Sequence, residues 1–492
     1  MRFPFLHQVI RRNASDSRLV AGLLGVLLTA LSGCATPLPK LAPPVPVQWQ
    51  HGGGTAAAKP TDLHGWWQAF GDPQLDALVA RALSTNLDVA QAVQRLLAVR
   101  TLQRRAQARF LPSVHASTTQ MIDPDASASF LVAGFDASWE LGLFGKRTGT
   151  RREAQGQLDA STADLRSAHV TLVAEVVREW IELRTAQRHE QLLLQVNQAR
   201  QQQWHAQQIR DRLQLATAGA ADQAQAAFAQ STAALAAPRQ AITSSAQQLA
   251  VLLGQNEPDP TWLQPGPPPE LGAWRLASAP ADLLRTRPEI AHAEAEVLRA
   301  AGELGLARAN RYPSVGLGGS LIWSTDLNNN RRNTVNNTIS SLGPMVDIPL
   351  FDWGMRAAAA HAKDHELQAS VLAYRQAVLQ GVAEVETALG NLQQQQQREH
   401  QDEIAWQALQ RTEQTMRTRV RLRVGNPIDQ AESEVAAAQA ALELADARAT
   451  RSLAYVALFK ALGGAPLPPA TPAVTSAAPS PVPETTADEA RH

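Results

Sequence analysis

The chain has 492 residues, which is enough for several domains or for one elongated domain. Its 45 basic and 45 acidic residues balance, so the composition gives no argument for a nucleic acid or for another strongly charged partner. Aromatic residues make up only 5%, while alanine and glutamine are abundant. This composition favours long, closely packed helices.

Residues 1–33 are typical of a secretory signal peptide. Arginines precede an apolar run over residues 19–31, which at about 1.5 Å per residue is too short to cross a bilayer core of about 30 Å. The run ends at Leu31-Ser32-Gly33-Cys34, which resembles the lipobox of bacterial lipoproteins. That resemblance implies cleavage before Cys34, a covalent lipid on its sulfur and, because Ala35 follows, the outer membrane. The alternative is a chance cysteine at the end of an ordinary export signal.

Three segments are predicted to be linkers or tails rather than folded units. Residues 34–61 predict a lipidated N-terminal tether, residues 258–280 a proline-rich link, and residues 465–492 a Pro/Ala/Thr tail that cannot bury a core. No run after Leu31 approaches 18 apolar residues, so no membrane-spanning helix is predicted. A closed β-barrel is the remaining way for this backbone to cross a bilayer.

The remaining residues form two copies of one unit, 62–257 and 281–464. The stretch 86–114 recurs 201 residues later as 287–315, and Pro112 falls on Pro313. Three later landmarks also recur: Leu143-Phe144 with Leu350-Phe351, Gly219 with Gly425, and Leu253-Gly254 with Leu462-Gly463. The chain is therefore one supersecondary unit used twice.

Each copy predicts one very long helix and two shorter ones. The long helices are expected over about 145–217 and 356–424, where sevenfold apolar spacing indicates coiled-coil seams. At 1.5 Å per residue each would reach roughly 100 Å. The short helices, at about 86–110, 220–252, 287–311 and 428–462, could stack end to end along the long ones. Pro238 should kink its helix.

Each copy also predicts two strands, at about 113–121 and 130–141 and at about 314–323 and 338–350. Alternating apolar and polar residues match strands with one lipid-facing side. The predicted lipid-facing residues are Leu131, Phe135, Trp139, Leu317, Leu321 and Trp323. The alternative is strands lying on a soluble core. Four strands cannot close a transmembrane barrel, whereas three chains would supply twelve and leave room for a pore.

Four segments in order resemble the outer membrane factor family, the TolC-like exit ducts of tripartite efflux pumps, and within it the lipoprotein branch. They are WWQAFGDPQLDALVARALSTNLDVAQA, FDASWELGLFGKR, LLRTRPEIAHAEAEVLRAA and GPMVDIPLFDWGMRA. The resemblance implies a mainly α fold with a membrane portion: a homotrimer whose 12-stranded outer-membrane β-barrel continues into a periplasmic α-helical coiled-coil barrel. It also implies a periplasmic adaptor (membrane fusion protein) and an inner-membrane transporter as partners, and passive transport as the function.

In the family, the tunnel closes at its periplasmic tip, which here corresponds to the turns at Gly219 and Gly425. Carboxylates crowded near a trimer axis would favour cations and form a gate. The candidates are Asp222, Asp429, Glu432 and Glu434. Pro427, Ala431 and Glu434 replace aspartates of the family pattern, so the alternative is that these are solvated acids at helix starts.

Other functions are less well supported by the residues. A periplasmic adaptor lipoprotein is the main alternative, but it would need one hairpin flanked by compact β-domains. His361 and His365 have the spacing of helix-borne metal ligands, yet the sequence offers no evident third ligand. No nucleophile motif, phosphate loop or Cys/His cluster is recognisable. The sequence therefore predicts no enzyme and no cofactor beyond the lipid on Cys34.

Overall fold

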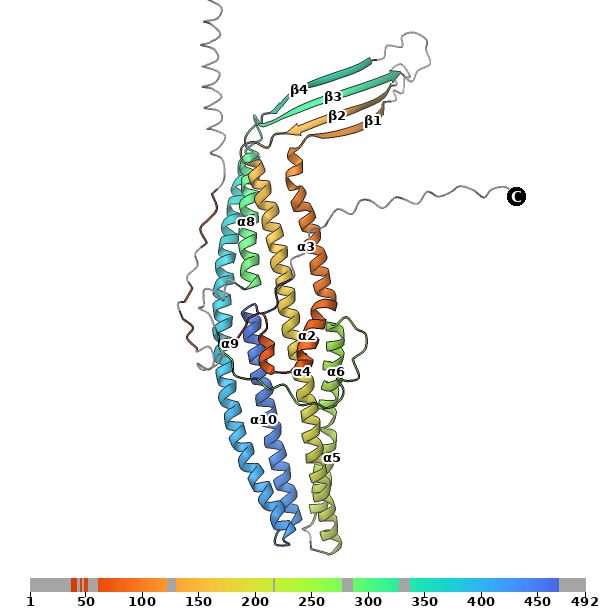
Figure 1. Ribbon diagram of the computed structural model, residues 1–492, viewed down its shortest axis with the longest axis vertical. Coiled ribbons are helices and arrows are strands. Elements are labelled where there is room, and N and C mark those ends of the chain that lie inside the picture. Colours follow the sequence, from red (N-terminus) through yellow and green to blue (C-terminus); the bar gives the residue numbers. More distant parts are fainter. Residues whose placement is uncertain are drawn as a thin grey trace, which may run out of the picture.

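The computed structural model describes residues 37–41, 45–46, 48–51, 61–121, 130–215, 217–276, 286–326 and 337–468. The molecule is elongated, with one β-sheet at one end and helices that run away from it in parallel (Figure 1). Within the described residues, no helix combines the length and the apolar character needed to cross a membrane.

The described residues of the first copy form nine elements. They are η1 (Trp66–Phe70), α2 (Pro73–Thr85), α3 (Leu87–Arg105), η2 (Ala106–Phe110), β1 (Ser113–Met121), β2 (Phe130–Glu140), α4 (Lys146–Arg212), α5 (Ala220–Ala233) and α6 (Ala236–Leu252). Capping side chains set the boundaries of the short helices. Asn86 separates α2 from α3 and accepts hydrogen bonds from the N–H groups of Asp88 and Val89.

The second copy contributes α8 (Pro288–Ala309), β3 (Ser314–Asp326), β4 (Asn337–Asp347), α9 (Met355–Arg421) and α10 (Pro427–Ala461). Proline occupies the first position of both α8 and α10, where its missing N–H costs no helical hydrogen bond. Asn426 caps α10 by accepting a hydrogen bond from the N–H of Ile428.

The two long helices, α4 and α9, have 67 residues each, so each is about 100 Å long. Each begins at a glycine in the left-handed region, Gly145 (φ 89°) and Gly354 (φ 81°), which follows a left-handed aromatic residue, Phe144 or Trp353. The structural counterpart of Phe144 is therefore Trp353. The sequence alignment of Phe144 with Phe351 is wrong because the second copy carries two extra residues before its helix.

The short helices line the long ones end to end. α3, α6 and α5 lie along α4, while α8 and α10 lie between α4 and α9 (Figure 1). The helix expected over 220–252 breaks between Ala233 and Ala236, just before Pro238, whose ring and missing N–H disrupt the preceding turn.

Close packing of α4 against α8 depends on glycine. A Cβ on Gly156 would lie 2.5 Å from the backbone nitrogen of Arg299, and one on Gly149 would lie 2.9 Å from the carbonyl oxygen of Gly302. These distances leave no room for a side chain. The glycine that interrupts the first long helix in the sequence is therefore required by contact between two backbones.

The largest apolar core lies near the middle of the long axis of the molecule, which we call the waist. It lies halfway along α4 and around the C-terminal end of α10. Trp66 stacks on Phe459 at 5.6 Å and meets Tyr455 edge-on at 5.8 Å. Trp180 of α4 is fully buried, and its indole N–H donates to Asp72 at 2.7 Å. This core joins η1, α2, α4, α6 and α10 into one body.

Candidate functional site

The four strands form one antiparallel sheet in the order β1-β2-β3-β4. The central pair, β2 and β3, comes from different copies of the unit. Trp139 lies opposite Leu317, Phe135 opposite Leu321, and Leu131 opposite Thr325. Both halves of the chain therefore build the sheet. Residues that lie directly opposite each other share a face of the sheet.

The large apolar side chains of this sheet lie mainly on one face, and the small and polar ones mainly on the other. All six predicted lipid-facing residues lie on one face, and that face also carries Val114, Leu342 and Val346. Phe135, Leu321 and Trp323 are 56%, 47% and 41% exposed, although large apolar side chains are normally buried. The opposite face carries mostly small or polar residues, which are Ser113, Asp136, Ser138, Gly318, Ser320, Ser341 and Asp347, and also the apolar residues Val132, Ile322, Ile339 and Met345.

Exposed aromatic side chains mark the junction between the sheet and the helices. Phe351 is 75% exposed and Trp353 87% exposed, and their rings meet at 4.7 Å. Aromatic rings gather in this way at membrane–water boundaries. The sequence analysis did not single out this pair, although Phe-Asp-Trp directly after an apolar strand is a readable signal.

The opposite end of the molecule consists of two helix-to-helix turns. α4 and α9 end alike: Gln214 and Arg423 are left-handed, and the following N–H groups of Leu215 and Val424 donate back to Arg210 and Arg419 at 2.8 and 2.9 Å. This pattern is a Schellman C-cap. Both predicted turn glycines lie in these turns.

The two glycines play different roles, so they are not structural equivalents. Gly219 is left-handed (φ 78°) and caps α5. Gly425 has no positive φ and instead packs closely, since a Cβ there would lie 2.9 Å from the nitrogen of Val420.

The three acids of α10 that were predicted to form a gate point toward different neighbours. Asp429 accepts a hydrogen bond from the Asn426 amide at 3.1 Å, Glu432 accepts one from Gln203 of α4 at 3.2 Å, and Glu434 lies 3.7 Å from Arg417 of α9. Asp222 is exposed in the first turn of α5. Within one chain these carboxylates do not converge.

Arginines accompany the acids at the tip, and sequence reasoning about a gate overlooked them. Arg417 pairs with both Glu413 and Glu434. Arg419, Arg421 and Arg423 follow it and are exposed. The signal was visible as RTRVRLRV, an alternation of basic residues at the end of a helix.

The described part of the tether lies along the helices. Leu38 and Leu41 lie against α4 and α8, and farther along Gln50 donates its backbone N–H to Glu386 of α9 at 2.8 Å. The ring Nδ1 of His51 lies 3.1 Å from the same carboxylate. Cys34 itself lies outside the described residues.

The two histidines considered as metal ligands are both exposed on α9. Among the described residues, no group of three or more His, Cys, Asp or Glu side chains could hold a metal ion. These positions lie on an outward helix face.

Comparisons with known proteins identify the family to which this chain belongs. Residues 78–255 and 279–464 match the family described as outer membrane efflux protein. The pyoverdine export outer membrane protein OpmQ of Pseudomonas aeruginosa is 29% identical over 450 residues, 85% of this chain and 91% of that protein. Nodulation protein T of Rhizobium leguminosarum bv. trifolii is 27% identical over 383 residues, 74% of this chain and 80% of that protein.

A solved structure is similar along nearly its whole length. The outer-membrane channel OprN superposes with a TM-score of 0.73 at 25% identity, covering 88% of this chain and 100% of the OprN chain. The two family segments coincide with the two copies of the repeated unit. The chain belongs to the outer membrane efflux protein family.

Proposed function

We propose that three copies of this chain form a lipid-anchored exit duct through which a tripartite pump passes small molecules or ions to the exterior. Proteins of this family are outer-membrane efflux channels and not enzymes. The observation that carries the proposal is the sheet with an exposed apolar face at the end of helices about 100 Å long. The fold gives no support to the adaptor alternative, because this chain has two hairpins and one shared sheet.

The open edges of the sheet support assembly. β1 and β4 lie at the two edges, so among the residues that the structure describes their outward N–H and C=O groups have no strand partner within one chain. Such groups are costly in a lipid environment. Pairing β4 of one chain with β1 of the next would satisfy them, and three chains would close twelve strands around a conduit lined by the polar face.

The position of the tether supports a lipid anchor at Cys34. Leu38 lies beside Ala163, in the quarter of α4 nearest the sheet. Four residues span at most about 14 Å, so the length of chain between Leu38 and Cys34 is compatible with a lipid held near the sheet end of the molecule. An acyl chain there would enter the same membrane as the apolar face. Intact mass measurement of membrane-extracted protein should show a chain that begins at Cys34 with added acyl mass.

The proposed lipid-facing surface is tested by one pair of neighbouring residues in β3. Leu321→Arg puts a charge on the apolar face, and Ser320→Arg puts the same charge on the polar face. Near the bilayer midplane the first should cost about 2–4 kcal/mol of membrane insertion, while the second should be mild. Insertion is measured by outer-membrane fractionation and heat-modifiable trimers. Equal effects of the two variants would contradict the assignment of faces.

For the tip, we propose that Asp429 and Glu432 of three chains form the cation-preferring part of a gate. Glu434 contributes less, because Arg417 already offsets its charge. Replacing Asp429 and Glu432 by their amides should reduce cation selectivity and multivalent-cation block of the reconstituted channel. Asp222→Asn, in the other turn, is the control. If the double variant keeps its ion preference, these acids are solvated residues at a helix start.

The proposed partners are a periplasmic adaptor at the tip and an inner-membrane transporter behind it. The proposal is supported by the position of the two turns at the end farthest from the sheet (Figure 1). Co-purification of both proteins with the tagged channel, and its loss when the tip turns are altered, would test this assignment.

A further inference from the structure

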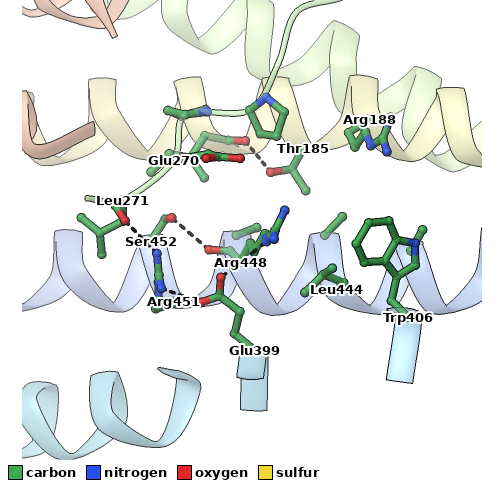
Figure 2. A pocket seen from close by; sticks show the side chains of 16 residues that line it. Thr185, Arg188, Glu270, Leu271, Glu399, Trp406, Leu444, Arg448, Arg451 and Ser452 are labelled. Carbon is green, nitrogen blue, oxygen red and sulfur yellow. Dashed lines mark hydrogen bonds and ion pairs between the residues drawn. The ribbon is translucent and has the colours of Figure 1, made fainter. Parts of the chain in front are cut away.

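A cavity of about 190 Å³ lies at the waist, between the two halves of the chain. α4 forms one wall, α9 and α10 form the facing wall, and the middle of the link (residues 268–271) covers one end (Figure 2). The cavity belongs neither to the sheet faces nor to the tip. None of the surfaces used in the proposed function includes it.

The charges between α9 and α10 in this cavity already compensate one another. Glu399 of α9 lies 2.7 Å from Arg451 and 3.4 Å from Arg448, both on α10. Arg451 also donates to the carbonyl oxygen of Leu271 at 2.9 Å, which fastens the link to α10. Two guanidinium groups therefore share one carboxylate, and Arg448 also reaches Glu403 at 3.8 Å.

The opposite wall carries Arg188, and the acid that the link contributes, Glu270, lies at the other end of the cavity from it (Figure 2). Arg188 of α4 donates to the neutral Gln191 amide at 3.4 Å, and among the described residues it has no carboxylate within salt-bridge distance. The ring of Trp406 and the buried side chain of Leu444 line the same end of the cavity (Figure 2). The facing stretch of α10 presents the small residues Ala441 and Ala445, which leave the space open.

From this arrangement we propose that the cavity binds a small aromatic carboxylate. A cavity of about 150 Å³ is large enough for a benzene ring, so this one has room for a ring and a carboxylate. A guanidinium without an acid pairs with a carboxylate in bidentate geometry, while Trp406 and Leu444 provide apolar contact for the ring. Because the walls come from both copies of the unit, the ligand would bridge the two halves of the chain.

The test uses purified full-length protein in detergent and three probes of one size: benzoate, benzyl alcohol and benzylamine. Binding is followed by equilibrium dialysis and by ligand-observed NMR. Benzoate should bind saturably in roughly the millimolar range expected for so small a ligand. Benzyl alcohol should bind more weakly, and benzylamine weakest of the three.

Arg188→Gln should weaken benzoate binding roughly tenfold or more, because a charged hydrogen-bonding partner is lost, and should leave benzyl alcohol unchanged. Arg200→Gln is the matched control, since Arg200 lies on the same helix and makes the equivalent bond to Gln203, at 2.8 Å. Ala445→Met should abolish binding of all three probes by filling the cavity, with the charges intact.

Several outcomes would overturn the proposal. These are benzoate binding that Arg188→Gln leaves intact, a preference for benzylamine, binding that survives Ala445→Met, or no saturable benzoate binding. None of these results depends on channel activity, so the proposed exit-duct function is tested separately from this site.

Discussion

The two long helices, α4 and α9, have the same length and the same kind of ends, yet they occupy different environments. α4 is the central helix of the chain and contacts α2, α3, α5, α6, α8 and α10, whereas α9 packs mainly on α8 and α10. With Gly145 aligned on Gly354, Ala163 and Val170 of α4 correspond to Leu372 and Leu379 of α9. The first two are 3% and 4% exposed, and the second two are 61% and 55% exposed.

This difference shows that duplication gave the two helices separate roles. α4 uses small and branched residues to pack inside its own chain. α9 carries leucines at the corresponding positions, where within one chain nothing covers more than about half of each side chain. Exposed large apolar residues in a row indicate a surface that another molecule covers. In the proposed trimer, that surface of α9 would meet the next chain.

The largest expected effect comes from filling the tight crossing of α4 and α8. Gly156→Leu should lower the free energy of unfolding by about 3 kcal/mol or more, because even its Cβ would overlap the α8 backbone. The corresponding position in α9 is His365, which is exposed. His365→Leu should change stability by less than about 0.5 kcal/mol.

Thermal or denaturant unfolding followed by circular dichroism measures both variants. If the two substitutions lower the free energy of unfolding equally, the tight crossing with α8 does not distinguish α4 from α9, and this explanation of their difference is wrong.

A second prediction concerns association rather than folding. Leu372→Ser with Leu379→Ser should leave the helical content intact but weaken the oligomer by about 1–2 kcal/mol per side chain, since these residues are already partly buried. Native mass spectrometry or analytical ultracentrifugation in detergent measures the change. Val170→Ser in α4 is the contrasting variant and should destabilise the fold itself. An oligomer of unchanged stability would show that α9 faces something other than a second copy.

The smallest expected effect concerns the tether, whose residues Gln50 and His51 hydrogen-bond to the second long helix. α9 carries Glu386 where α4 has the buried Val177. Burial tends to raise the pKa of Glu386, but hydrogen bonds from Gln50 and His51 outweigh it and hold the pKa below the ordinary value of 4.5. A lowered folded-state pKa means that the docking contribution is present above pH 4.5 and is lost as the pH falls through the folded value.

Limited proteolysis within residues 37–51 should therefore accelerate in acid. Glu386→Gln should show faster cleavage already at neutral pH, because an amide cannot accept these bonds as a carboxylate does. Glu443→Gln, at an exposed position on α10, is the control. Cleavage that is independent of both pH and Glu386 would mean that Trp49 and the other apolar contacts alone hold the tether.

Much of the architecture could be read from the sequence because it depends on local patterns. The proline-free stretches with sevenfold spacing predicted both long helices to within a few residues of their ends. The period-two alternation correctly grouped the six predicted apolar residues on one face, because side chains alternate across a strand whatever its partners are. Pro238 predicted a kink in its helix, since its ring and missing N–H act on the helix that contains it, and the structure has a break between α5 and α6 just before it.

What only the tertiary structure decided are the contacts between residues far apart in the chain. The sequence could nominate Glu434 as a gate residue, but its pairing with Arg417 depends on how α9 and α10 lie against each other. The sequence gives no reason for a glycine at position 156, whereas the structure shows that the α8 backbone leaves no room there for a Cβ. Arg188 and Trp406 share a cavity because two copies of one unit fold onto each other. A sequence pattern predicts the local structure of each segment. Which groups a charge, a backbone or a ring contacts depends on how segments far apart in the sequence pack together.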